Sequence, residues 1–115
     1  MITRIKSGPR MSQAVVHGNT VYLAGQVASN RSADTAGQTR EILASIDGLL
    51  AEAGTDKSRL LAATIYLTDM STFNEMNAVW DAWVAPGSAP ARATVGAPLA
   101  SSAYRVEIVV IAARP

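Results

Sequence analysis

The segment Tyr104-Arg105-Val106-Glu107-Ile108-Val109-Val110-Ile111-Ala112-Ala113 alternates in the way that a β-strand does, and both of its faces carry apolar side chains. Side chains along a strand point to opposite faces with period two. One face therefore holds Val106, Ile108, Val110 and Ala112, and the other holds Arg105, Glu107, Val109 and Ile111. A sheet built around this strand needs a cover on each side.

The same alternation recurs in five further segments, which we interpret as strands: residues 2–6, 13–17, 20–25, 60–67 and 90–96. Gly18-Asn19 between the second and third segments is a two-residue hairpin signal. Helical periodicity predicts helices over residues 35–53 and 72–84. This order predicts one α+β domain over residues 1–115, a mixed sheet with two helices packed on one face.

The predicted core lies on one face of each element. The first helix contributes an apolar stripe, and Asp34 or Thr35 is its expected N-cap. The second helix has an aromatic stripe, and Thr72 with Glu75 has capping-box spacing. The core positions are Ile42, Leu43, Ile46, Leu49, Leu50 and Ala53 on the first helix, Phe73, Met76, Trp80, Trp83 and Val84 on the second, and Leu61, Ala63, Ile65 and Leu67 on the strand before it.

Composition excludes several classes of function. The 115 residues include no cysteine and a single histidine, so disulfides, a thiolate nucleophile and a cysteine-based metal site are excluded. The formal net charge is +1, with no cluster of lysine and arginine, which argues against nucleic acid as a partner. No segment is long and apolar enough for a membrane span or a signal peptide, so we expect a cytoplasmic protein.

Two helices cover only one face of such a sheet, and the remaining face is expected to pack against another copy of the chain. Large exposed apolar patches usually mark interfaces, and closed cyclic symmetry is the common solution. We assign to this uncovered face Tyr22, Ala24, Ala62, Thr64, Tyr66, Val109 and Ile111, together with Arg92, Thr94 and Glu107.

Arg92 is the leading candidate for a binding residue. In the strand over residues 90–96, Ala91, Ala93 and Val95 would face the core, and Arg92 with Thr94 the other side. A guanidinium on a rigid strand suits a planar anion, which it grips through two parallel N–H bonds. An exposed arginine, or an ion pair between subunits that includes Glu107, explains the same residue equally simply, and the residues alone leave these alternatives open.

Five short stretches together form a recognisable pattern: Ser12-Gln13-Ala14-Val15-Val16, Leu23-Ala24-Gly25-Gln26-Val27, Phe73 with Met76-Asn77-Ala78-Val79-Trp80, Pro90-Ala91-Arg92, and Val106-Glu107-Ile108. In this combination the chain resembles the Rid family, the YjgF-type reactive intermediate deaminases, over essentially its whole length. The resemblance implies a chorismate-mutase-like fold and a homotrimer with clefts between subunits. It also implies hydrolysis of 2-imino acids and their enamine tautomers to 2-oxo acids and ammonia, with no cofactor and no metal.

Carried over residue by residue, the resemblance makes Arg92 the clamp for the substrate carboxylate and Glu107 the group that positions or activates water. The backbone of Gly25 and of Thr94 would hold the substrate. Met11, Ala24 and Asn77 would line the cleft. Met11 stands where the best-known deaminases carry a tyrosine, Ala24 replaces a serine, and Thr94 replaces a cysteine.

Two other functions fit the same pattern. A trimer that binds small carboxylates or 2-oxo acids without turnover would need the same arginine, and the missing hydroxyls at Met11 and Ala24 keep this alternative to the enzyme open. RNA cleavage is attached to some members of the family, but the near-zero net charge weighs against it.

Overall fold

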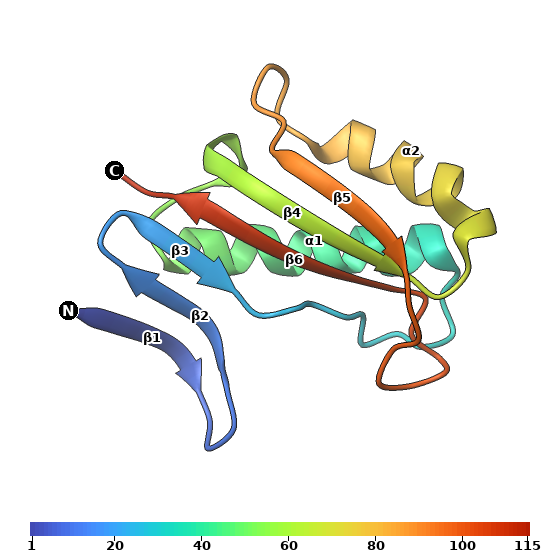
Figure 1. The fold of residues 1–115 in the computed structure, drawn as a ribbon, viewed down its shortest axis with the longest axis horizontal. Helices are drawn as coiled ribbons and strands as arrows, with labels where there is room; N and C mark the ends of the chain where they lie inside the picture. The colour runs from blue at the N-terminus through green and yellow to red at the C-terminus, as the bar shows by residue number, and fades with distance from the viewer.

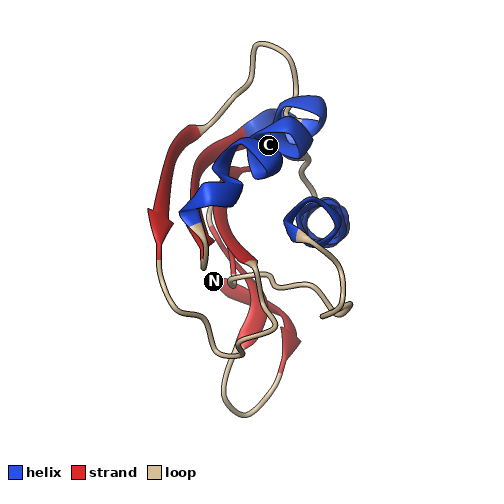
Figure 2. Cartoon of the chain, turned by 90° about the vertical axis from the view of Figure 1, so that its right-hand side faces the viewer, coloured by secondary structure: helices blue, strands red, loops and turns tan.

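The computed structural model describes all 115 residues and shows a six-stranded mixed sheet with both helices on one face (Figures 1 and 2). The predicted α+β class is therefore confirmed. The strands are β1 (Ile2–Ser7), β2 (Ser12–His17), β3 (Thr20–Leu23), β4 (Leu60–Leu67), β5 (Ala91–Gly96) and β6 (Val106–Ala113). The helices are α1 (Thr35–Glu52) and α2 (Phe73–Trp83), and short 3-10 turns precede β4 and α2 at Lys57–Arg59 and Met70–Thr72.

The strand order is β1-β2-β3-β6-β4-β5, so β6, whose two faces both carry apolar side chains, lies inside the sheet. β6 pairs antiparallel with both β3 and β4. β4 and β5 run parallel, and α2 connects them. Because a parallel crossover must return to the starting end of the sheet, α2 runs antiparallel to β5, as Figure 1 shows. β5 is an edge strand, and α2 is the helix layer beside it.

The core fills the space between the sheet and the helices. Every predicted apolar position of α1 is buried there, and so are Met76 and Trp80 of α2, while Phe73, Trp83 and Val84 pack against it partly buried. Buried strand residues include Ile65 and Leu67 of β4 and Ile108 and Val110 of β6. Neither helix is long and apolar enough to cross a membrane.

One core position on β4 was predicted wrongly. Leu61 is 51% exposed, whereas Leu60 is 6% exposed. The register with β6 shifts between Leu60 and Ala62, which is a β-bulge. A bulge inserts one residue and reverses the alternation of faces on one side of it. Ala63, Ile65 and Leu67 lie beyond the bulge and are buried as predicted.

The two helix starts differ from each other. Asp34 caps α1 as predicted, and its side chain accepts the N–H of Gly37 at 2.8 Å. The capping box at α2 is absent, because the Thr72 hydroxyl donates to the carbonyl of Asp69 at 2.7 Å instead. Glu75 accepts the N–H of Ala36 at 2.8 Å and so ties α2 to the first turn of α1. The spacing of Thr72 and Glu75 is compatible with a capping box, but Glu75 instead accepts an N–H group at the start of the neighbouring helix.

Candidate functional site

The strand register places Arg92 and Thr94 on the helix side of the sheet, opposite to the face predicted for them. Arg92 pairs with Ala63 and Thr94 pairs with Ile65, and both of these β4 residues are buried beneath the helices. Ala91, Ala93 and Val95 are exposed on the other face. The reason is that β5 is the edge strand of the sheet. There the short helix α2 covers the sheet only in part, so polar side chains such as Arg92 and Thr94 remain partly exposed on the helix side. The alternation of side chains along β5 was predicted correctly, but the face of β5 that points toward the helices was not.

Arg92 rests on an aromatic surface. Its guanidinium carbon lies 5.4 Å from the centre of the Trp80 ring, and Trp80 is 4% exposed. Arg92 forms no hydrogen bond or ion pair within the chain, whose one ion pair joins Lys6 and Glu52. Stacking on an aromatic face stabilises a cation without using its N–H donors. The guanidinium is therefore held in place with its donors free for an external anion.

Two further predicted site residues each leave a buried polar atom without a partner: Oγ1 of Thr94 and Oδ1 of Asn77. Buried polar atoms are almost always hydrogen-bonded, so each exception needs an explanation. Thr94 follows Arg92 on the same face of β5. Asn77 lies one turn before Trp80 on α2, which runs antiparallel to β5, so the two orphan oxygens lie toward the same end of the site. A small polar ligand beside Arg92 would satisfy them.

Gly25 and Glu107 form a second contact, on another part of the sheet. A Cβ atom at Gly25 would overlap the Glu107 carboxylate and come within 2.9 Å of its Cδ atom. The neighbouring Gln26 exchanges backbone hydrogen bonds with Ile108, at 2.9 and 3.1 Å, and this bridge holds the segment against β6. Glu107 is partly buried and has no hydrogen-bond or ion-pair partner in the chain. A side chain at position 25 would therefore force the Glu107 carboxylate to move from this position.

Arg92 and Glu107 cannot meet within one chain. Glu107 pairs with Tyr66 and faces the open side of the sheet, whereas Arg92 pairs with Ala63 and faces the helices. Their positions differ by two strand spacings of about 4.8 Å and by three residues of about 3.3 Å along the strands. The prediction that Arg92 and Glu107 share one face is therefore wrong. A single small ligand contacts both only if a second copy supplies one of them.

The remaining open-face residues lie as predicted. Tyr22, Ile111 and Ala62 form one row across β3, β6 and β4, and Tyr66 with Glu107 lies in another. Tyr22 is 45% exposed in the single chain. Met11, 49% exposed, lies in the turn between β1 and β2, and Ala24 follows β3 directly before Gly25. Both therefore lie on the Gly25 side, away from Arg92.

Two further residues, which the sequence patterns did not single out, shape this region. Trp80 was assigned to the core alone, and only the α2–β5 packing reveals the contact with Arg92. Gln38 is fully buried; its amide donates to the carbonyls of Ala33 and Ala103 and its Oε1 accepts the N–H of Arg105. It thereby fixes the loop that leads into β6 and Glu107. A polar residue inside the apolar stripe of α1 was the available signal.

No group of three or more histidine, cysteine, aspartate or glutamate side chains in the chain is placed to hold a metal ion. The acidic side chains with altered pKa values have structural partners. Backbone N–H groups of Ser29 and Asn30 lower the pKa of Glu41, and hydrogen bonds from Ser58 and Ser71 lower the pKa of Asp56 and Asp69 respectively.

Comparison with known proteins places the chain in a family. The family described as Endoribonuclease L-PSP matches residues 1–114. A RutC family protein of Haemophilus ducreyi is 48% identical over 98% of this chain and 97% of its own length. The RutC family protein YoaB of Escherichia coli is 47% identical, with 97% of each chain covered.

Solved structures agree with this assignment. A YjgF-family protein from Neisseria meningitidis, NMB1025, has a TM-score of 0.97 and 47% identity, covering all of this chain and 96% of its own. A YjgF/YER057c/UK114 family member from Mycobacterium tuberculosis, Rv2704, has a TM-score of 0.89 and 29% identity, covering 98% and 99% of the two chains. The fold is accordingly the chorismate-mutase-like fold of that family, as predicted. On sequence and structure together, this chain belongs to the YjgF/Rid/RutC family, the Endoribonuclease L-PSP family of the sequence match.

Proposed function

We propose that the protein is a cofactor-independent hydrolase that deaminates 2-imino acids and their enamine tautomers to 2-oxo acids and ammonia. The observation that carries this proposal is the free Arg92 guanidinium on Trp80, beside the unpartnered oxygens of Thr94 and Asn77. A planar carboxylate matches the guanidinium fork. The Thr94 hydroxyl is free to donate to the same carboxylate, and the Asn77 oxygen is free to accept from a ligand N–H.

The reaction needs water, a proton acceptor and a fixed substrate. In this proposal Glu107 takes a proton from water as the water oxygen bonds to the carbon of the protonated imine, which gives a tetrahedral carbinolamine. Glu107 returns that proton to the amine nitrogen. The C–N bond then breaks, ammonia leaves, and Glu107 accepts the hydroxyl proton as the carbonyl forms. A base within hydrogen-bond reach of the water is what such a step requires. The absence of a side chain at Gly25 leaves room for the Glu107 carboxylate, which has no ion-pair partner in the chain and is free for this role.

The complete site lies between subunits in this proposal. Gly25 and Glu107 come from one chain, and Arg92, Thr94 and Asn77 come from its neighbour. The apolar open face, with Tyr22, Val109 and Ile111, is the surface through which a homotrimer forms. In a ring of three chains every interface joins two different patches, so Glu107 of one chain would meet Arg92 of the next.

The test is release of ammonia and 2-oxo acid from imino acids generated in place by an amino-acid oxidase. The wild-type protein should accelerate both, and Arg92→Lys should not, because lysine keeps the charge but lacks the bidentate fork. If the wild-type protein binds 2-oxo acids but releases no ammonia from any imine, it is a carboxylate-binding trimer without turnover.

Cleavage of RNA is the function named in the matched family's description, and it has its own test. Binding to RNA depends on neutralising phosphates and weakens steeply as salt rises. With ten lysine and arginine residues against nine acidic ones, the chain supplies almost no net attraction. We expect no salt-dependent binding to single-stranded RNA in a filter or anisotropy assay.

A further inference from the structure

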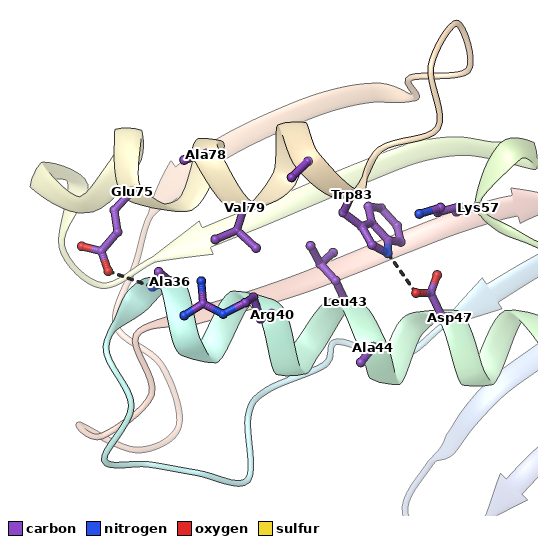
Figure 3. Close-up of a pocket in the computed structure, with 11 residues that line it drawn as sticks. Ala36, Arg40, Leu43, Ala44, Asp47, Lys57, Glu75, Ala78, Val79 and Trp83 are labelled. Atoms are coloured by element: carbon purple, nitrogen blue, oxygen red, sulfur yellow. Dashed lines mark hydrogen bonds between the residues drawn. The ribbon is translucent and has the colours of Figure 1, made fainter.

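We infer a second binding site in the groove between the two helices, with a small aromatic anion as its ligand. The groove has a volume of about 590 Å³ and lies on the outer side of the helix layer, away from the open sheet face (Figure 3). Sites for small molecules usually measure about 300–1,000 Å³. This inference is independent of the proposed deaminase activity.

Small residues create the groove. The facing positions of the two helices include four alanines, and Leu43 and Val79 supply its apolar lining: Ala36 and Ala44 belong to α1, and Ala78 and Ala82 belong to α2. Helices that meet through alanines leave unfilled space between the larger side chains beside them. Trp83 closes one end as an aromatic wall, so a flat apolar body fits along this surface.

The polar groups of the groove favour an anion. Glu75 already accepts the N–H of Ala36 at 2.8 Å, and Asp47 accepts the indole N–H of Trp83 at 3.0 Å. The two cations, in contrast, have no carboxylate partner: Arg40 forms no ion pair, and the Lys57 nitrogen lies over the Trp83 ring at 5.2 Å. The two carboxylates keep their charge but already accept hydrogen bonds, whereas the N–H donors of Arg40 have no partner and remain available to a ligand.

Arg40 is the group we assign to the anionic end. Lys57 is already placed on Trp83, whereas Arg40 projects from the middle of the groove wall in Figure 3. A ligand with its aromatic body against Trp83 and Val79 would bring its anionic group to Arg40. The ligand class is an aryl carboxylate or sulfonate with one charge and one or two rings.

The experiment uses two dyes that differ in one charged group. The anionic dye 8-anilinonaphthalene-1-sulfonate and its uncharged analogue N-phenyl-1-naphthylamine are titrated into the full-length protein, and fluorescence reports binding. We expect the sulfonate to bind at least about tenfold more tightly than the neutral dye, which is the gain of roughly 1.4 kcal/mol expected of a charge-assisted contact. Equal affinity for the two dyes would overturn the assignment of an anion.

Variants locate the site. Ala78→Leu fills the groove and Arg40→Gln removes its free cation, and each should weaken sulfonate binding about tenfold. Arg59→Gln, an exposed cation outside the groove, and Arg92→Ala, in the proposed active site, should both leave it unchanged. Circular dichroism checks that each variant is folded. Undiminished binding by Ala78→Leu, loss of binding by Arg92→Ala, or no binding by the wild-type protein would each overturn the inference.

Discussion

The guanidinium of Arg92 lies over the ring of Trp80, and Trp80 in turn packs against Trp83 at 5.4 Å between ring centres. The cation thus rests on Trp80, whose ring is itself packed against a second aromatic ring of the helix layer. This relationship turns an edge-strand arginine, which would otherwise sample many rotamers, into a group with a fixed direction. It makes Trp80 a positioning residue for whatever anion Arg92 binds.

Replacing Trp80 separates its two roles. Trp80→Phe keeps an aromatic face, whereas Trp80→Leu keeps only apolar volume. We expect Trp80→Leu to raise KM for the imino acid about fivefold, in line with cation–π energies of about 0.5–2 kcal/mol, and Trp80→Phe to raise it less. Both variants should melt at lower temperature because a buried side chain shrinks. Phe73→Leu is the control, since Phe73 packs against the core from the same helix, about two turns before Trp80. An equal rise of KM in this control would assign the effect to general packing.

Gly25 is expected to be irreplaceable for activity although it is dispensable for folding. In Gly25→Ala the added methyl group displaces the Glu107 carboxylate, and a misplacement of about 1 Å costs roughly 100-fold in rate. Gly48→Ala is the matched control, because a Cβ there meets nothing within 4 Å. Within α1 that change should stabilise the protein by about 0.5–1 kcal/mol and leave kcat/KM unchanged. Full activity of Gly25→Ala would remove Glu107 from the proposed reaction.

Gly25 and Glu107 show how much of the structure could be predicted from the sequence. The period-two and period-3.6 patterns determine which elements form, and all six strands and both helices were predicted. The bulge at Leu61 depends on hydrogen bonding between segments that are distant in the chain, and so does the face of β5 that points toward the helices. No local pattern encodes either feature. The contact of Gly25 with Glu107 joins residues 82 positions apart. Only the family resemblance linked them before the structure did.

The open face of the sheet should drive assembly. Light scattering of the wild-type protein at micromolar concentration should give three times the chain mass of 12.0 kDa. Val109→Lys places a charge in the middle of this face and should yield monomers, because burying an unpaired charge costs several kcal/mol, of order 3–5. Ala44→Lys adds the same charge to the exposed side of α1 and should remain trimeric. A wild-type monomer would contradict the assembly.

Glu41 should make stability depend on pH at the acidic end. Its carboxylate accepts the N–H groups of Ser29 and Asn30, which lowers its pKa and anchors the loop after Gly25 to α1. A carboxyl whose folded pKa lies below its unfolded value stabilises the protein above the unfolded pKa and loses that contribution as pH falls through the folded one. Glu41→Gln should therefore melt earlier than wild type at pH 7, and the difference should vanish well below pH 4.5, the ordinary value for this group. A difference independent of pH would show that charge is not involved.

In the proposed reaction, Arg92 and Glu107 act on one substrate from two different chains. Arg92→Ala and Glu107→Gln should each be folded, trimeric and nearly inactive. The two proteins are then mixed, unfolded and refolded together, and native mass spectrometry confirms that mixed trimers form. Some interfaces in these trimers join an intact Arg92 to an intact Glu107, although no single chain contains both.

With random assembly, each interface has about one chance in four of combining the two intact residues, because every interface takes one patch from each of two chains. The mixture should therefore recover about a quarter of the wild-type rate of ammonia release. If verified hybrid trimers remain as inactive as their two parents, Arg92 and Glu107 do not form a shared site between chains.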